Sequence, residues 1–593
     1  MTQNLTTPGI DRPWLKYYSE EIIHARLPEM TMYQYIWEKN RDYLSDAAFR
    51  YYGARITYGG LFEQIWKAAS AFYAHGVRPG DIVTIMSMHT PETIACIYAL
   101  NYIGAVANLV YVTLSEKEIL LTLQSTKSKM FFALDAALER VNRIQDDLHV
   151  PVVILGVSDS MPWYMKLGYW LKVKPAGHRY MTFQDFLKKG EPTLPPMAVD
   201  HTAPAVIIYT SGTTGEPKGI VHTNDSLNAQ AFQEGNSGFG IRRGARFLNA
   251  IPMFLGYGMS KMHLAVSSGI DSWLWIVPDP DSMADQLFKC RPNIYVTGPA
   301  LIDHVLNHPN GDLKPLYCLI GGGADMPAEK EEQLNRKLRE CGASAIYANG
   351  YGMTETDASL TASRNDVHKP GSIGIPLFKT NIRVISPEDG RELSFNEVGE
   401  LWFSTPSLMK CYYNNPEATA AVISTDRDGV RWIHTGDLGC IDEEGFVFIR
   451  GRIKRIFPTK SVDGIVNKLY PQLIEDTLNA VPFVEKCAAL VREDPQRLHM
   501  ARAYVTVKPD TAGETGQLLS MLTETVQREL PAYEHPEVIQ IIETIPMAPS
   551  GKIDYRALEK LVERTTTCAL PPRRHRNPTR CKIWSEKLPN KGL

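Results

Sequence analysis

The segment 209–219, YTSGTTGEPKG, constrains this 593-residue chain more than any other. Its glycines permit backbone conformations that a Cβ atom would forbid, so that successive N–H groups can converge on one anion. Hydroxyl groups and one lysine add further donors, enough for a di- or triphosphate. We therefore expect a polyphosphate-binding loop. The residues expected to contact phosphate are Thr210, Ser211, Gly212, Thr213, Thr214, Gly215 and Lys218.

Two other interpretations of this segment are a plain surface turn and a Walker loop. A surface turn rich in glycine and threonine rarely places a lysine behind so many donors. A Walker loop needs Gly-Lys-Ser/Thr at the start of a helix. Here Pro217 separates Gly215 from Lys218, and the following residues 220–222 have strand composition. The pattern favours a phosphate loop that is not of the Walker type.

The composition is that of a globular protein with more than one domain. Hydrophobic residues make up 44% and charged residues 22% of a chain that is too long for one ordinary core. The formal net charge of −3 gives no field that would favour nucleic acid. Nine cysteines are scattered without a CxxC pair, which predicts reduced thiols and a cytoplasmic location. We expect neither a signal peptide nor a membrane-spanning segment.

Helical and strand-like patterns alternate through the first half of the chain. Segment 61–75 has apolar residues at helical spacing, 81–88 is rich in β-branched residues, and 91–103 is again helical. The alternation returns over 203–320. This pattern predicts an α/β fold with two α/β subdomains, each built on a largely parallel sheet.

The composition changes after about residue 376. Short strand-like runs separated by Gly, Asp and Asn predict a β-subdomain, which completes a large N-terminal domain over 1–451. Another, smaller α/β domain is expected over 457–563. The last residues, 564–593, are rich in proline and arginine and are expected to form a disordered basic tail. A tether to an anionic surface or a partner is the alternative.

Segment 209–219 resembles the signature of the adenylate-forming superfamily, which includes acyl-CoA synthetases, adenylation domains of peptide synthetases and luciferases. Further motifs follow in the family's order as far as residue 554, so the resemblance covers most of the chain. The chain is most similar to the AMP-forming acyl-CoA ligases. The resemblance implies an AMP-binding domain over 1–451, a mobile C-terminal domain, and ATP, Mg²⁺ and coenzyme A as the small molecules used.

The run 349–356, NGYGMTET, resembles the family motif GYGMTE. The resemblance implies that Tyr351 stacks on adenine, Thr354 contacts the α-phosphate and Glu355 helps to hold Mg²⁺. A carboxylate beside polyphosphate is repelled unless a hard cation lies between them. In the preceding glycine run, Gly322 and Gly323 would let adenine or an acyl chain lie against the backbone. A tight strand-to-helix turn is the alternative for that run.

The run 432–437, WIHTGD, resembles the family motif HTGD. It implies that Asp437 accepts both ribose hydroxyls, although a turn-capping aspartate is the alternative. The resemblance also implies that Arg452 reaches the ribose. Lys454 holds the place of the hinge residue within 452–456, about which the small domain swings in relatives. Arg455 departs from the acidic residue that many relatives carry next, which leaves the local hinge contacts open.

Segment 549–554, PSGKID, resembles the family's C-terminal Gly-Lys motif and implies that Lys552 is catalytic. Attack of a carboxylate on the α-phosphorus brings two anions together, and one ammonium that touches both stabilises that state. Loss of one such preorganised donor typically costs about 10²–10³ in rate. Lys552, Thr354 and Glu355 are the expected catalytic set, with Glu355 as the metal ligand.

Segment 251–258, IPMFLGYG, resembles the family motif that lines the acyl pocket. Leu255 stands where many fatty-acyl and aryl-activating relatives have histidine, and no carboxylate occurs in 251–266 to pair with an α-amino acid. An uncharged pocket favours an apolar tail. Phe254, Leu255, Tyr257 and Met353 are the expected wall residues, and membership of the ordinary core is the alternative.

These features predict an AMP-forming acyl-CoA ligase that acts on an apolar carboxylic acid. A fatty acid is the first choice, and aryl and sterol-type acids stay open. A stand-alone enzyme that loads a carrier protein is the main alternative. A nonenzymatic nucleotide-binding relative is disfavoured by the presence of Lys218, Glu355, Asp437, Arg452 and Lys552.

Segment 161–174, MPWYMKLGYWLKVK, interleaves aromatic and aliphatic residues with lysine. We expect a surface segment that packs its aromatic side chains on the body of the protein. The alternative is a helix that lies in a membrane interface.

Overall fold

The computed structural model describes residues 6–567 except for 174–178, 191–193, 195–199, 211–216, 278, 299–300, 324–325, 327, 456, 462–463, 510 and 548–552. Several expected site residues therefore lie outside the described residues: Ser211, Gly212, Thr213, Thr214, Gly215 and Lys552. The backbone of Lys454 is described, but its side chain is not.

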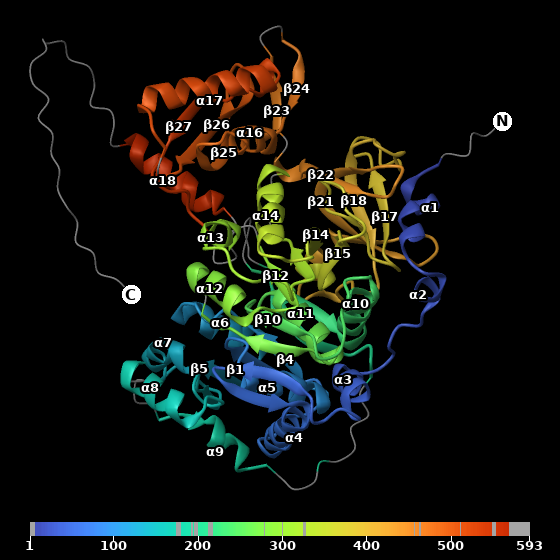
Figure 1. The fold of residues 1–593 in the computed structure, drawn as a ribbon, viewed down its shortest axis with the longest axis vertical. Helices are drawn as coiled ribbons and strands as arrows, with labels where there is room; N and C mark the ends of the chain where they lie inside the picture. The colour runs from blue at the N-terminus through green and yellow to red at the C-terminus, as the bar shows by residue number, and fades with distance from the viewer. Residues whose placement is uncertain are drawn as a thin grey trace, which may run out of the picture.

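Two large sheets, in which most neighbouring strands are parallel, form the body of the N-terminal part (Figure 1). The first has eight strands in the order β19-β9-β8-β4-β3-β5-β6-β7 and is parallel from β8 to β7. Its strands are β3 (Ile82–Met86), β4 (Val106–Leu109), β5 (Met130–Leu134), β6 (Val152–Leu155), β7 (Met181–Thr182), β8 (Pro204–Tyr209), β9 (Gly219–Thr223) and β19 (Cys411–Tyr412).

The second sheet has nine strands in the order β16-β15-β14-β13-β12-β10-β11-β1-β2 and is parallel from β14 to β1. Its strands are β1 (Ala47–Tyr51), β2 (Ala54–Thr57), β10 (Arg246–Asn249), β11 (Asp271–Leu274), β12 (Ile294–Thr297), β13 (Cys318–Gly321), β14 (Tyr347–Met353), β15 (Ala358–Ala362) and β16 (Ile375–Pro376). The expected α/β fold with two subdomains is confirmed.

The largest core cluster lies where helices pack between these sheets. Helices α5 (Pro91–Tyr102) and α11 (Gly256–Ser267) are buried over almost their whole length, so neither has a solvent face. The start of α5 follows from its sequence, because the Thr90 side chain accepts the N–H of Thr93 and Pro91 occupies the first turn.

The remaining helices of this part cover the sheets or lie at their edges (Figure 1). They are α1 (Pro8–Asp11), α2 (Glu20–His24), α3 (Met32–Asn40), α4 (Tyr58–Ala74), α6 (Glu116–Thr126), α7 (Leu138–Arg143), α8 (Trp163–Val173), α9 (Phe183–Leu187), α10 (Asn224–Asn236), α12 (Pro280–Cys290), α13 (Ile302–Asn307), α14 (Ala328–Glu340) and α15 (Pro416–Ala420), with the short 3-10 helices η1 (Pro13–Tyr17), η2 (Asp135–Ala137) and η4 (Thr354–Thr356).

A five-stranded antiparallel sheet follows, as the composition after residue 376 predicts. It contains β17 (Asn381–Ile385), β18 (Gly399–Ser404), β20 (Ile423–Thr425), β21 (Arg431–Ile441) and β22 (Val447–Arg452). The sequence pattern predicts short strands over 429–433 and 445–449 in this region, and β21 and β22 extend beyond these runs at their C-terminal ends. As a result, the WIHTGD run and the Gly-Arg pair lie within paired strands and not on turns.

The C-terminal unit packs α16, α17 and α18 with a three-stranded sheet and a two-stranded ribbon (Figure 1). Its elements are η5 (Ile453–Arg455), β23 (Phe457–Lys460), β24 (Val466–Leu469), α16 (Pro471–Asn479), β25 (Val484–Asp494), β26 (Leu498–Val507), α17 (Thr515–Glu529), η6 (Ala532–Glu534), β27 (Val538–Ile541) and α18 (Tyr555–Thr567). Helix α18 continues through Thr567, into the first residues of the segment 564–593 expected to form the tail.

Helix α8 does not pack as expected. Tyr169 and Met165 lie against the core, but Trp163 and Trp170 are 79% and 62% exposed. The expectation that this segment buries its aromatic side chains is therefore wrong for the two tryptophans. Within the described residues, no helix combines the length and the apolar character needed to cross a membrane.

Candidate functional site

Three of the expected nucleotide contacts meet between β14, β21 and β22. Asp437 and Arg452 are directly opposite each other in the β21–β22 pair, and Arg452 Nε lies 2.8 Å from Asp437 Oδ1. The hydroxyl of Tyr351 donates a hydrogen bond to the other carboxylate oxygen, Oδ2, at 2.5 Å. Burial and the Asp437 carboxylate raise the pKa of Tyr351, so the phenol keeps its proton and remains a donor. The carboxylate of Asp437 is buried, whereas Arg452 is largely exposed.

The expected metal ligand, Glu355, is held by a tyrosine that the sequence motifs do not include. The hydroxyl of Tyr412 on β19 donates to Glu355 Oε1 at 2.7 Å, and the N–H of Met409 donates to the Glu355 carbonyl. The ammonium of Lys218 lies 4.8 Å from the centre of the Tyr412 ring, within cation–π range. One tyrosine thus connects the phosphate-loop lysine with the buried carboxylate.

The described ends of the phosphate loop are tied to each other. The N–H of Thr210 donates to the carbonyl of Lys218 at 3.1 Å, and the N–H of Lys218 donates to the Thr210 hydroxyl at 3.2 Å. These bonds continue the antiparallel β8–β9 pair, so the loop leaves and re-enters the sheet at one point. The strand expected after the loop is confirmed as β9.

Thr354 joins the expected nucleotide motifs to the motif expected to line the acyl pocket. Its carbonyl accepts a hydrogen bond from Nε2 of His222, 2.8 Å away, and burial lowers the pKa of His222 to about 4, which keeps the ring neutral. A Cβ atom on Gly256 would lie only 2.8 Å from Thr354 Cγ2. The first turn of α11 therefore packs directly against the residue expected to contact the α-phosphate.

The glycine run at the end of β13 lies beside the same motif. A Cβ atom at Gly322 would lie 3.1 Å from the carbonyl oxygen of Gly350, one residue before Tyr351. Gly323 has a φ of +88° and is exposed. The parallel register places the ends of β13 and β14 side by side, which explains this proximity.

The four expected acyl-wall residues do not belong to one hydrophobic cluster. Phe254 is buried and, with the half-buried Leu255, packs in the largest core; the Phe254 ring lies 4.8 Å from that of Tyr111. Tyr257 packs with the cluster beneath the second sheet, and Met353 packs with the β-subdomain. Phe254 thus fits the alternative of ordinary core membership. Tyr257 and Met353 are instead the sequence neighbours of Gly256 and Thr354, the two residues that pack against each other.

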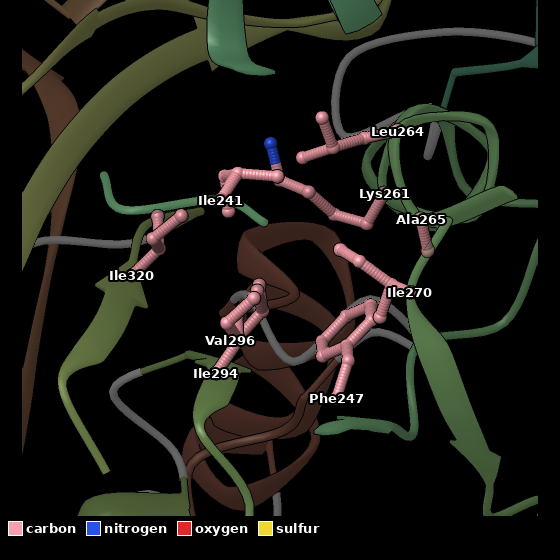
Figure 2. A pocket seen from close by; sticks show the side chains of 9 residues that line it. All are labelled: Ile241, Phe247, Lys261, Leu264, Ala265, Ile270, Ile294, Val296 and Ile320. Carbon is pink, nitrogen blue, oxygen red and sulfur yellow. The ribbon is translucent and has the colours of Figure 1, made fainter. Parts of the chain in front are cut away.

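A small cavity of about 10 Å³ lies between α11 and the second sheet (Figure 2). Its walls are aliphatic and aromatic apart from Lys261, which is one helical turn beyond Tyr257. Lys261 is buried and forms an ion pair with the buried Glu234 of α10. Segment 251–266 alone predicts an uncharged pocket, because it contains no carboxylate. The structure instead places a buried ion pair there, since the carboxylate of Glu234 comes from another helix.

Arg455, in the segment expected to form the hinge, belongs to a buried network. Its guanidinium binds both carboxylate oxygens of Glu475 on α16, at 3.0 and 2.8 Å, and also the hydroxyl of Tyr555 on α18, at 2.9 Å. Tyr555 in turn lies 3.0 Å from Glu475 Oε1, and Glu475 is 3% exposed. Arg455 stands where many relatives carry an acidic residue. In this chain α16 supplies the carboxylate that pairs with it, within the C-terminal unit.

Comparison with known proteins agrees with this geometry. The model of the AMP-binding enzyme family matches residues 36–413, and that of the AMP-binding enzyme C-terminal domain matches residues 473–552. The chain is 27% identical to a long-chain-fatty-acid–CoA ligase of Bacillus subtilis, over 92% of this chain and 97% of the relative. It is 28% identical to a feruloyl-CoA synthase of an Amycolatopsis species, over 85% of this chain and 94% of the relative.

Among solved structures, the fold is similar to that of ATP-bound MatB from Rhodopseudomonas palustris. The TM-score is 0.77 at 21% identity, with 90% of this chain and all of that chain covered. The first family model alone spans more than half of the sequence. The chain therefore belongs to the AMP-binding enzyme family, as an adenylate-forming enzyme of the AMP-forming carboxylate–CoA ligase type.

Proposed function

We propose that this chain activates an apolar carboxylic acid, with a fatty acid as the first choice, and transfers the acyl group to coenzyme A. The observation that carries this proposal is the packing of Gly256 against Thr354. The motif expected to line the acyl pocket thus shares a wall with the motif expected to hold the α-phosphate, which is where a carboxylate must be placed to attack.

On the nucleotide side, Tyr351 would stack on adenine, while Asp437 and Arg452 would hold the ribose. Both carboxylate oxygens of Asp437 are already engaged, one by Tyr351 and one by Arg452. Ribose hydroxyls would have to share or replace these contacts, and the exposed Arg452 is the side chain with more room to move. Gly322 and Gly323 would border the base.

The phosphates would lie against Thr210, Lys218 and the loop residues Ser211, Gly212, Thr213, Thr214 and Gly215. Mg²⁺ usually keeps several waters and takes only one or two protein carboxylates together with substrate phosphates. The buried Glu355 carboxylate fits that requirement, and no group of three or more metal-binding side chains occurs among the residues that the structure describes. When bound, Mg²⁺ would neutralise charge on the phosphates.

The chemistry would proceed in two steps. The carboxylate oxygen bonds to the α-phosphorus as the bond to pyrophosphate breaks, with Lys552 and Thr354 stabilising the developing charge. The C-terminal domain, 457–563, then swings about Lys454 in the hinge 452–456. A thiolate of coenzyme A bonds to the acyl carbon, and AMP leaves.

Two observations support an apolar acid. Lys261, which follows the expected acyl motif on α11, is paired with the buried Glu234 and so offers no free cation to a polar substrate. The family relatives include enzymes named for a long-chain fatty acid and for ferulate, which are acids with large apolar parts. Leu255 and Met353 would add apolar surface near the carboxylate.

The test is a panel of fatty, aryl and sterol-type acids, assayed for pyrophosphate release with and without coenzyme A. We expect a fatty acid to give the highest kcat/KM and coenzyme A to be needed for AMP release. Adenylation that needs a phosphopantetheinyl carrier protein for AMP release would support the carrier-loading alternative. No acid-dependent pyrophosphate release from any acid of the panel would contradict the proposal.

A further inference from the structure

Helix α8 exposes an apolar stripe that nothing in the proposed reaction uses. Trp163, Leu167, Trp170 and Leu171 follow helical spacing i, i+4, i+7 and i+8, so their side chains share one face. They are 79%, 53%, 62% and 58% exposed. Contiguous apolar surface of this kind on a folded protein usually marks a contact surface.

The exposed stripe belongs to a helix that is held in place. Met165 and Tyr169, on the opposite face of α8, pack against the largest core cluster. The Tyr169 hydroxyl also donates to Asp135 Oδ2 at 3.2 Å, which ties this face to the neighbouring segment. The outward direction of the stripe is therefore fixed by its anchored inner face.

The chemistry of the segment fits a lipid surface better than a second protein. Tryptophan and leucine beside lysine are typical of helices that lie in a membrane interface. Segment 161–174 contains three lysines and no acidic residue, a composition that complements an anionic headgroup layer, and Lys166 is the one of the three whose side chain the structure describes. In Figure 1, α8 lies at the end of the large domain that is remote from the C-terminal unit, so docking there would leave that unit free to move.

We propose that α8 docks this chain on the surface of an anionic lipid membrane, with the stripe of Trp163, Leu167, Trp170 and Leu171 inserted among the acyl chains near the headgroups. If the substrate is the apolar acid proposed above, docking would bring the enzyme to the phase in which that acid concentrates. Docking itself does not depend on the identity of the acid.

The experiment is co-sedimentation of the full chain with two kinds of phosphatidylcholine vesicle. One kind contains no anionic lipid, and the other contains roughly 30–40% phosphatidylglycerol, which gives a surface potential of tens of millivolts. We expect binding to the anionic vesicles and weaker binding to the neutral ones. The triple variant Trp163→Gln/Leu167→Gln/Trp170→Gln should lower the partition coefficient at least about tenfold, because binding scales with the apolar area inserted. Lys166→Ser should weaken only the binding to anionic vesicles.

The matched control is Leu121→Gln/Met521→Gln, which removes two apolar side chains that are 52% and 51% exposed on other helices. It should bind vesicles as the wild type does. Circular dichroism and pyrophosphate release in the absence of vesicles test whether each variant is folded and active, separately from docking.

Three results would overturn the proposal. The first is wild-type protein that stays in the supernatant with both kinds of vesicle. The second is a triple variant that binds as well as the wild type, which would assign binding to another basic sequence such as 568–593. The third is a dimer in sedimentation velocity that the triple variant loses, without vesicle binding, which would make the stripe an interface between two copies of the chain.

Discussion

The hydroxyl of Tyr412 donates to Glu355 Oε1 at 2.7 Å, and the ammonium of Lys218 lies 4.8 Å from the centre of the same ring. Burial and the carboxylate raise the pKa of Tyr412, so this phenol is a donor throughout the working pH range of an enzyme. Tyr412 thus orients the carboxylate expected to hold Mg²⁺ and supports the cation expected to bind phosphate. We regard it as a positioning residue for both.

Tyr412→Phe tests this role, because it removes the hydrogen bond and keeps the ring under Lys218. A hydrogen bond to a charged group contributes about 1.5–3 kcal/mol, so we expect kcat/KM for ATP to fall at least about tenfold. The Mg²⁺ concentration for half-maximal rate should rise, which a merely structural loss would not cause. Tyr413→Phe, on the adjacent residue, should change neither value, and an unaltered Mg²⁺ dependence in Tyr412→Phe would argue against the assignment.

Asp437→Asn should weaken ATP binding much more than acid binding. The substitution removes the charge that pairs with Arg452 at 2.8 Å, and it removes half of the acceptor capacity proposed for the ribose. We expect the KM for ATP to rise about tenfold or more, equivalent to about 1.4 kcal/mol, with the KM for the acid within a factor of about two. Pyrophosphate exchange as a function of each substrate measures both values.

The control for that variant is Asp442→Asn, directly after β21, which removes the charge that pairs with Lys369. It should leave both KM values near those of the wild type. Equal effects of the two substitutions would mean that Asp437 acts through the stability of the sheet and not through the nucleotide.

Glu475→Gln should destabilise the C-terminal unit strongly. The substitution leaves the guanidinium of Arg455 without its charged partner in a site where Glu475 is 3% exposed. Breaking a buried ion pair by removing one partner costs about 3–5 kcal/mol. Denaturant unfolding monitored by hydrogen exchange in α16 and α18 measures this loss.

The same unit offers a matched comparison in the pair Arg492–Glu537, whose side chains are 43% and 30% exposed. Arg492→Met should cost no more than about 1 kcal/mol, since exposed ion pairs contribute little. Similar losses for Glu475→Gln and Arg492→Met would show that the Arg455 network is not a special support of the hinge.

His222 predicts a specific dependence of stability on pH. Burial lowers its pKa to about 4 from an ordinary value near 6.5, so the unfolded chain binds more protons than the folded chain between these two values. The wild type therefore loses stability through this residue as the pH falls from 6.5 towards 4. Relative to His222→Gln, its free energy of unfolding should fall by up to about 1.4 kcal/mol per pH unit. A difference between the two proteins that stays constant from pH 7 to pH 5 would contradict this.

Local sequence signals predicted most of the fold, because hydrophobic alternation and helix caps act over a few residues. Thr90 and Pro91 at the start of α5 are an example. The extent of β21 and β22 was not predictable in this way, since the WIHTGD run reads as a turn until its cross-strand partner is known. The outward face of α8 was missed because α8 carries apolar residues on two faces, and only the fold decides which one is covered.

The candidate site was likewise predictable from the sequence only in part. Tyr351, Glu355, Asp437 and Arg452 stand in recognisable motifs. The structure brings Tyr351 and Arg452 to the carboxylate of Asp437 and places Glu355 in η4, directly after β14. Tyr412 carries no local signal, since it reaches Glu355 through the pairing of β19 with β9. Glu234 and Glu475 were missed for a related reason, because each neutralises a cation that is distant in sequence.

The central claim is that the carboxylate of the acid attacks the α-phosphorus of ATP. The most direct measurement is turnover of the best acid of the panel, labelled with ¹⁸O in both carboxylate oxygens, in the presence of ATP and coenzyme A. Formation of an acyl-adenylate predicts one ¹⁸O atom in each AMP released and none in pyrophosphate. Label that appears in orthophosphate, with unlabelled nucleotide, would mean attack on the γ-phosphorus and would contradict the account.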